Sequence, residues 1–140
     1  TWRAVEKLLP QRPGIRMADL GSGLGGTLWH LADARPDAAF EGFETAPLVY
    51  LATRLRQFTQ PRANLRLRFL SLWRADLRSF DVVYCFLSPV PMARLYAKAR
   101  QEMKPGSLFI SNSFAVPDVE PDEIVVVDDS RRTRLLVFRM

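Results

Sequence analysis

The stretch DLGSGLGG at residues 19–26 decides the fold of this 140-residue chain. It follows an apolar run that predicts a buried strand over residues 14–20. It precedes residues 27–35, where apolar side chains recur at helical spacing. Glycines in a strand-to-helix turn permit positive φ angles and let a ligand approach the backbone. Four glycines within six residues therefore predict a ligand-binding loop.

Strands and helices alternate outward from this loop. Apolar and β-branched runs predict further strands, and apolar residues three and four apart predict further helices. The expected strands cover residues 38–44, 64–69, 81–87 and 107–114, and the expected helices cover 2–9, 48–58 and 92–103. Residues 123–127 and 133–138 flank a polar turn and predict an antiparallel hairpin. The pattern predicts an α/β protein with a parallel sheet and an antiparallel addition at its end.

Length and composition predict one domain. We expect an N-terminal helix and linker over residues 1–13 and the core over 14–140. With 48% hydrophobic and 25% charged residues, the chain is neither a disordered tail, a collagen-like repeat nor a coiled coil. No run approaches the roughly 20 apolar residues of a membrane-spanning helix. The single Cys85 lies in an apolar run and cannot form an internal disulfide, so we expect a buried thiol and a cytoplasmic location.

Positive charge is concentrated in the first part of the chain. Residues 1–80 carry 12 basic and 7 acidic residues, whereas residues 81–140 carry 8 of each. A basic surface attracts nucleic acid, anionic lipid or an acidic partner, and it is equally compatible with a plain solvated surface. Aromatic and arginine residues alternate over 66–74, which leaves nucleic acid open as a partner without a recognised motif.

An acidic residue distinguishes between two kinds of cofactor. Gly21, Gly23 and Gly26 fit the dinucleotide pattern G-x-G-x-x-G, whereas residues 19–25 fit D-x-G-x-G-x-G. A carboxylate at Asp19 repels a pyrophosphate by about 1 kcal/mol at ~4 Å even in water, and it attracts an ammonium group equally. The pattern therefore favours a cationic amino-acid ligand, with the dinucleotide as the alternative.

A second acidic residue, Glu44, ends the strand over residues 38–44. A carboxylate at this position can accept hydrogen bonds from both hydroxyls of a ribose, each contributing about 1.5–3 kcal/mol. Glu41 fits less well because it lies in the middle of the same strand. In the alternative role, Glu44 caps the following helix.

Together these residues resemble the class I S-adenosylmethionine-dependent methyltransferases. The resemblance rests on DLGSGLG at 19–25, on Glu44, on DVVYCF at 81–86, on MKPG at 103–106 and on the terminal hairpin. A narrower likeness connects the chain to a small group of lysine methyltransferases that modify the adenine nucleotide translocase and the c-subunit of ATP synthase. It lies in Glu44 followed by Pro47, in LW at 72–73 and in PVPM at 89–92.

The resemblance implies a fold and a cofactor site. The fold is a three-layer, Rossmann-like arrangement with a seven-stranded sheet of order 3-2-1-4-5-7-6 and strand 7 antiparallel. The cofactor is S-adenosylmethionine, with S-adenosylhomocysteine as product. Asp19 and the glycine loop would hold the methionine moiety, and Glu44 the ribose. Many relatives carry an acid beside the adenine, where this chain has Ser71 and Leu72. The expected cofactor-binding residues are Asp19, Gly21, Ser22, Gly23, Gly25, Glu44, Thr45, Ser71 and Leu72.

The loop after residues 81–87 should lie beside the methyl group, so Ser88 and Pro89 are the expected catalytic residues. Ser88 can accept a hydrogen bond from an incoming amine; in the alternative role it caps the next helix. Residues 111–114 are a second candidate for substrate contact. We expect His30 at the surface and no metal, because no Cys/His cluster has zinc-ligand spacing.

Short connections leave little chain to form a lid. We therefore expect an open active site and a protein lysine or another macromolecule as methyl acceptor. One alternative is a small-molecule methyltransferase that a partner subunit or missing residues close. Another is a non-catalytic module that binds the cofactor. The oligomeric state and the acceptor's identity are not predicted.

Overall fold

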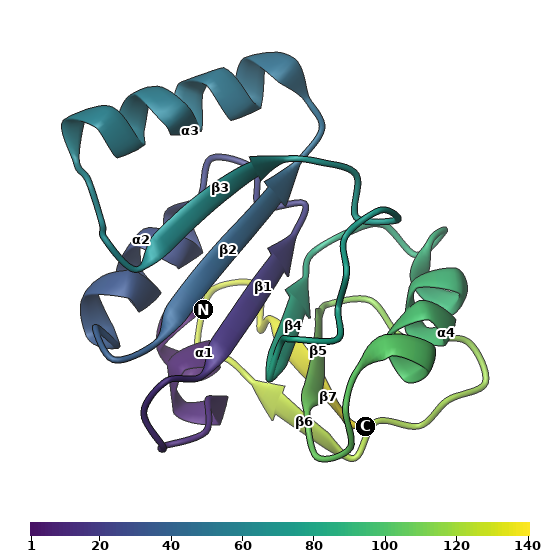
Figure 1. The fold of residues 1–140 in the computed structure, drawn as a ribbon. Coiled ribbons are helices and arrows are strands. Elements are labelled where there is room, and N and C mark those ends of the chain that lie inside the picture. Colours follow the sequence, from purple (N-terminus) through teal and green to yellow (C-terminus); the bar gives the residue numbers. More distant parts are fainter.

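A single seven-stranded sheet runs through the molecule (Figure 1), and the computed structural model describes residues 1–140. Its strands are β1 (Arg16–Leu20), β2 (Ala39–Glu44), β3 (Leu65–Phe69), β4 (Val82–Cys85), β5 (Leu108–Asn112), β6 (Glu123–Val126) and β7 (Arg134–Arg139). The helices are α1 (Trp2–Leu8), α2 (Gly26–Ala34), α3 (Pro47–Thr59) and α4 (Met92–Glu102). The strand order is β3-β2-β1-β4-β5-β7-β6, which confirms the order that the resemblance implies.

The direction of the strands positions the site. Strands β1 to β5 pair in parallel, and β7 runs antiparallel to both β5 and β6. In this register Leu20 at the end of β1 lies opposite Phe43 of β2 on one side and Cys85 of β4 on the other. The carboxyl ends of the three strands therefore open onto one edge of the sheet, where α/β proteins bind their ligands.

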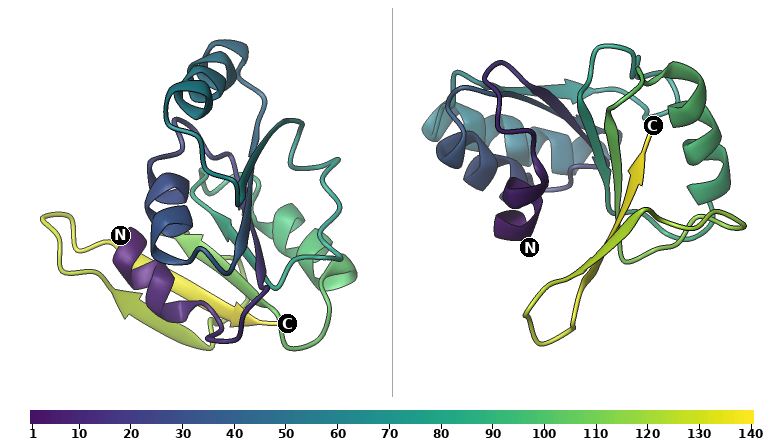
Figure 2. Two further views of the ribbon diagram at one scale, coloured as in Figure 1. Left: turned by 60° about the vertical axis from the view of Figure 1, so that its left-hand side comes forward. Right: turned by 90° about the horizontal axis from the view of Figure 1, so that it is seen from below.

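Helices cover both faces of the sheet and complete three layers (Figure 2). Helices α1 and α2 lie on one face, where Val5, Leu28 and Leu31 join a core of 18 buried residues. Helix α4 lies on the other face, where Leu95 and Ala99 join a second core of 16 buried residues. No helix has both the length and the apolar character needed to cross a bilayer.

Several strand boundaries differ from the sequence-based expectation. Strand β1 begins at Arg16 because Gly14 has a φ of 75° and turns the chain. Strand β4 ends at Cys85, so the apolar residues that follow it belong to a loop. Strand β5 ends at Asn112 because Ser113 adopts a φ of 72°. The apolar runs continue past these points because apolar side chains of the loops, such as Ile15 and Leu87, also pack against the cores.

Helix α3 lies where it was expected, but its apolar stripe faces solvent. Thr53 is its only buried residue, whereas Leu48, Leu51, Leu55 and Phe58 are exposed. Helical periodicity predicts that these side chains share one face, but it does not say which face meets the sheet.

The expectations of a buried Cys85 and an exposed His30 are confirmed. Cys85 is fully buried, and burial raises the pKa of its thiol to about 12, so it stays protonated and unreactive at neutral pH. Trp29 is buried, and its indole N–H donates to the carbonyl of Gln60 at 3.1 Å. His30 is exposed and stacks on Trp2 at a ring separation of 4.9 Å.

Candidate functional site

Hydrogen bonds from its backbone amides hold the glycine loop across the end of β2. The amides of Gly21 and Ser22 both donate to the carbonyl of Phe43, at 2.9 and 3.0 Å. The next amide, that of Gly23, donates to Glu44 Oε2 at 3.0 Å. Because three successive N–H groups are used within the protein, the loop does not offer them to a pyrophosphate, as a dinucleotide-binding loop would.

The glycines divide into two kinds. Gly21, Gly23 and Gly25 all have positive φ angles, of 76°, 57° and 75°. A Cβ at Gly21 would lie 2.9 Å from a methyl group of Leu87, and one at Gly25 would lie 2.6 Å from the ring of Trp29. A Cβ at Gly23 would meet nothing within 4 Å. Packing against the Trp29 ring therefore requires Gly25, whereas the Leu87 methyl can shift away from Gly21 and the space in front of Gly23 is open to a ligand.

Gly26 decides against the dinucleotide pattern. In that pattern the third glycine lets the helix pack closely on the strand. Here a Cβ on Gly26 would meet nothing within 4 Å, and Gly26 is not among the glycines with positive φ. The three glycines that the backbone needs are those of D-x-G-x-G-x-G.

Asp19 is a buried carboxylate without a partner. Its residue is 4% exposed, and its side chain forms no hydrogen bond or salt bridge. Burial, and then the neighbouring charge of Glu44, raise the pKa of Asp19 to about 7. An unpaired buried charge is costly, and a cation placed beside it removes most of that cost. The ammonium group of a methionine moiety fits this requirement.

Glu44 accepts hydrogen bonds from the glycine loop and from the residue before α3, and its carboxylate can still accept further hydrogen bonds. Its Oε2 accepts from the Gly23 amide, and its Oε1 accepts from the Ala46 amide at 3.1 Å, just before α3 begins. Ala46 is the N-cap of α3 and no side chain caps the helix, so the helix-capping alternative for Glu44 is wrong. A carboxylate accepts about four hydrogen bonds, so two positions remain for ribose hydroxyls. Glu41 is excluded as the ribose ligand because it pairs with Arg16 at 2.9 Å and Arg68 at 3.3 Å.

The remaining cofactor-site candidates surround the same edge. Thr45 is exposed, and its side chain forms no hydrogen bond. Ser71 starts the turn after β3: its Oγ accepts from the Trp73 amide at 3.2 Å, and its carbonyl accepts from the Ala75 amide at 3.1 Å. Leu72 is partly buried against the second core. These three residues stay predicted ligands, and no acid replaces the one that relatives place beside adenine.

The predicted catalytic loop lies on the surface. Ser88 and Pro89 are both exposed. Pro91 is the N-cap of α4, and the Ser88 side chain forms no hydrogen bond, so the helix-capping alternative for Ser88 is wrong. The Ser88 hydroxyl is therefore free to meet another molecule.

A polar network joins β4 to residues 111–114, the second candidate for substrate contact, and its member Tyr84 was not among the predicted site residues. Asn112 Nδ2 donates to the hydroxyl of Tyr84 at 2.8 Å, and Ser113 Oγ donates to Asn112 Oδ1 at 2.6 Å. Tyr84 lies beside Asp19 in the strand register, and burial raises its pKa to about 12. Tyr84 was hidden in an apolar run, so only its pairing with Asn112 identifies it as a polar group of this edge.

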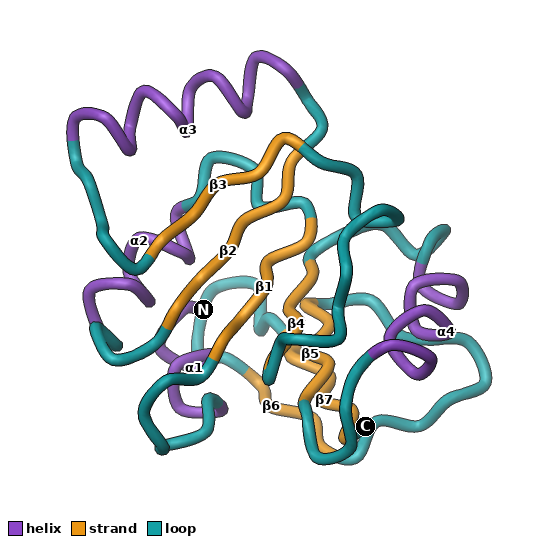
Figure 3. The backbone as a smooth tube through the Cα atoms, viewed as in Figure 1, coloured by secondary structure: helices purple, strands orange, loops and turns teal.

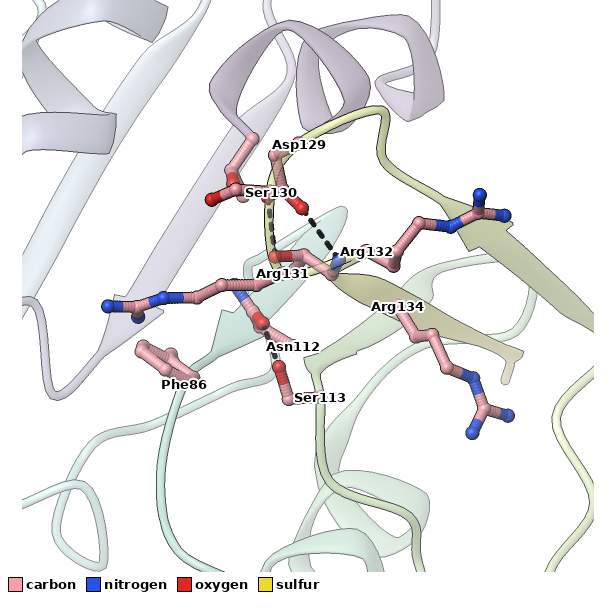
Figure 4. A pocket seen from close by; sticks show the side chains of 10 residues that line it. Phe86, Asn112, Ser113, Asp129, Ser130, Arg131, Arg132 and Arg134 are labelled. Carbon is pink, nitrogen blue, oxygen red and sulfur yellow. Dashed lines mark hydrogen bonds between the residues drawn. The ribbon is translucent and has the colours of Figure 1, made fainter.

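A cavity of about 510 Å³ lies beyond this network (Figure 4). Phe86 and Asn112 line it from the carboxyl ends of β4 and β5, and the turn at residues 129–134 closes it from the β6–β7 hairpin. Arg131 points toward Phe86, whereas Arg134 points away from it. The RRTR sequence at 131–134 was the only signal of this cluster, since nothing local places a hairpin turn over β4.

The sequence of this chain also matches a known protein family. Residues 19–123 match the model of the ANTKMT methyltransferase domain. The chain belongs to this family. The adenine nucleotide translocase lysine N-methyltransferase of Mus musculus is 32% identical over 124 residues, which cover 86% of this chain and 52% of that protein. The chain therefore spans about half the length of this curated relative.

Solved structures share the fold. An RNA methyltransferase from Salinibacter ruber, in complex with S-adenosyl-L-homocysteine, superimposes with a TM-score of 0.79 at 23% identity, covering 89% of this chain and 80% of that one. Precorrin-6y C5,15-methyltransferase from Geobacter metallireducens superimposes with a TM-score of 0.66 at 17% identity, covering 79% and 60%. Family and fold thus confirm an S-adenosylmethionine-dependent methyltransferase domain with S-adenosylmethionine as its cofactor.

Proposed function

We propose that this domain transfers a methyl group from S-adenosylmethionine to the side-chain amine of a lysine in a protein acceptor. The observation that carries the proposal is the contrast at one edge of the sheet. The unpartnered carboxylate of Asp19 lies buried on the cofactor side, and the loop at residues 88–90 is exposed on the acceptor side.

The cofactor residues act by binding and orienting. When bound, S-adenosylmethionine supplies a methyl group that its positively charged sulfur has already activated. Asp19 in its deprotonated form would hold the ammonium group, and Glu44 the ribose hydroxyls. Because the donor is already activated, the protein mainly aligns it with the acceptor, which contributes about 7–11 kcal/mol in favourable systems.

The acceptor side would receive a neutral amine. Ser88 can accept one N–H of the incoming lysine with its hydroxyl or its carbonyl, which points the nitrogen lone pair toward the methyl group. The loop lies at the surface, with Val90 91% exposed, so water can take the proton that the ammonium form must lose. This exposure also lets a side chain reach the site from a folded protein or a flexible segment.

The named relative supports a lysine acceptor. The Mus musculus protein that shares 32% identity is named a lysine N-methyltransferase of the adenine nucleotide translocase. The loops around the methyl position determine which class of acceptor can bind. The matched residues 19–123 include one of these loops, that with Ser88 and Pro89.

The cavity in Figure 4 favours a second candidate, a small anionic acceptor. Arg131, Arg132 and Arg134 bring three positive charges to its lining, which suits a carboxylate or phosphate group better than a lysine ammonium. In that case a partner subunit or further chain would close the site.

Labelled methyl transfer distinguishes these possibilities. The purified protein would be incubated with methyl-labelled S-adenosylmethionine and a cell extract, which is then separated into protein, RNA and small-molecule fractions. We expect label in protein, released as methyllysine on acid hydrolysis, and its absence with an Asp19→Ala variant. Label only among small molecules would favour the second candidate. No label in any fraction, with cofactor binding intact, would indicate a non-catalytic module.

A further inference from the structure

Helix α3 presents its apolar side chains to solvent. Leu48, Leu51, Leu55 and Phe58 are 81, 64, 64 and 84% exposed. Their spacing of three, four and three residues places them in one stripe along the helix. An ordinary surface helix buries such a stripe, so this stripe is available to something outside the fold.

Positive charge is in excess around this stripe. Residues 45–75 contain six arginines and no acidic residue, and only Arg62 and Arg68 among them pair with an acid, Asp33 and Glu41. Arg54 lies one turn from both Leu51 and Phe58, and it forms no salt bridge. Arg54 and Arg66 together line a hollow of about 510 Å³ between α3 and the strands β2 and β3, which Glu41 also lines. Neither of these two arginines forms a salt bridge, so two cations beside α3 are not neutralised within the protein.

We infer that α3 is an interfacial helix that docks the domain on an anionic bilayer surface. A helix with leucine and phenylalanine on one face and arginine beside them lies in the plane of such a surface, with its apolar side chains buried ~5–10 Å. Anionic lipid headgroups supply the charge that the arginines lack, and they attract each one from about a Debye length.

The surroundings of α3 favour lipid over the other occupants. The stripe is a ridge on a single helix, whereas peptide-binding proteins offer a groove. In a two-fold dimer the ridge would meet its own copy, and Arg54 and Arg56 would face like charges with no acid on the helix to pair with them.

Docking through α3 would bring the cofactor edge close to the lipid headgroups. Helix α3 begins three residues after Glu44. Leu24 in the glycine loop is 64% exposed, and its carbonyl accepts from Arg56 Nη1 at 3.5 Å, so an exposed apolar side chain of the loop lies close to α3. Acceptors at a membrane surface would then meet the open side of the site.

Vesicle co-sedimentation tests this inference and requires neither cofactor nor methyl transfer, so it is independent of the proposed function. The full chain would be mixed with vesicles of pure phosphatidylcholine, or of phosphatidylcholine with 30 mol% phosphatidylserine as the anionic probe. We expect binding to the second only, and weaker binding as salt is raised. Replacing Leu51, Leu55 and Phe58 together by Ser should weaken binding at least tenfold.

Matched controls lie at the opposite edge of the sheet. Ile124→Ser with Val126→Ser removes exposed apolar side chains from β6 and should change binding less than twofold. Arg54→Gln and Arg66→Gln should each weaken binding about fivefold, whereas Arg100→Gln should not. Because all these side chains are exposed, circular dichroism should show unchanged folding.

Two outcomes would overturn the inference. One is equal binding, or no binding, to neutral and anionic vesicles. The other is a stable dimer in sedimentation velocity that the triple Ser variant dissociates, because the stripe would then be covered by a second copy.

Discussion

The two sides of the site, at the same edge of the sheet, differ in how firmly their residues are held. On the cofactor side, Asp19 is buried and Glu44 accepts from two backbone amides. On the acceptor side, Ser88 and Pro89 are exposed, and the Ser88 side chain bonds to nothing in the chain. The difference matches the chemistry. The cofactor is the same in every reaction and carries an ammonium group at a constant place, whereas the acceptor is a separate molecule that must enter and leave. The connection between β3 and β4 at residues 70–81 forms no helix and also runs as loop (Figure 3).

The largest effect should follow from removing the buried carboxylate. Asp19→Ala is expected to weaken S-adenosylmethionine binding by about ten- to hundredfold, because a charged hydrogen bond contributes ~1.5–3 kcal/mol. Calorimetric titration measures this, with the exposed Glu120→Ala as a control of equal charge. Unchanged affinity for S-adenosylmethionine in a folded Asp19→Ala protein would show that the buried carboxylate does not bind the cofactor, and the two sides of the site would then not differ as described.

Two neighbouring acids on β2 should separate binding from stability. Glu44→Ala is expected to weaken cofactor binding about tenfold, because ribose contacts and the Gly23 anchor are both lost. Glu41→Ala should leave affinity unchanged and lower thermal stability, since Arg16 and Arg68 lose their shared partner. The reverse result, with Glu41 needed for binding, would show that the wrong acid has been assigned to the ribose.

The two kinds of loop glycine should respond differently to alanine. Gly25→Ala is expected to lower the unfolding free energy by about 2–3 kcal/mol, because it adds a 2.6 Å clash with Trp29 to an unfavourable φ. Gly23→Ala should cost only about 1 kcal/mol, because only its φ is unfavourable, yet it should reduce cofactor affinity by filling open space. Urea denaturation and calorimetry on both variants would check the pair. Equal stability losses would mean that Gly23 is also a packing glycine.

Cofactor binding should strengthen as pH rises through neutrality. The pKa of Asp19 is about 7 in the ligand-free protein. Below that pH the carboxyl is neutral and attracts an ammonium less, so affinity should rise about five- to tenfold between pH 6 and 7.5. Asp19→Asn should flatten this dependence, and an unchanged pH profile in that variant would assign the titration to another group.

A further pH effect concerns the ligand-free fold. The folded pKa of Asp19 lies above its ordinary value of 3.8, so the unfolded chain releases this proton first. Stability should therefore fall as pH rises from about 4 to 7, and Asp19→Asn should raise the unfolding free energy at pH 8 by about 1–3 kcal/mol. Denaturation of both proteins at pH 5 and pH 8 tests the sign. A destabilised Asp19→Asn at pH 8 would contradict it.

Local patterns were sufficient for the strand and helix alternation and for placing Asp19 and Glu44 at neighbouring strand ends. They failed where long-range packing decides. The stripe on α3 has the same period whether it faces the sheet or solvent, and Tyr84 resembles one more apolar residue of its run until its hydrogen bond from Asn112 on the neighbouring strand is known. The turn at 129–134 reaches the site only because β7 reverses direction beside β5.

Calorimetric titration of the ligand-free protein with S-adenosylmethionine, S-adenosylhomocysteine and NAD tests the central claim most directly. A loop whose amides are already bonded, between a buried Asp19 and a half-buried Glu44, should bind the first two saturably and at one site per chain. NAD should give no saturable heat. Binding of NAD alone would contradict the account.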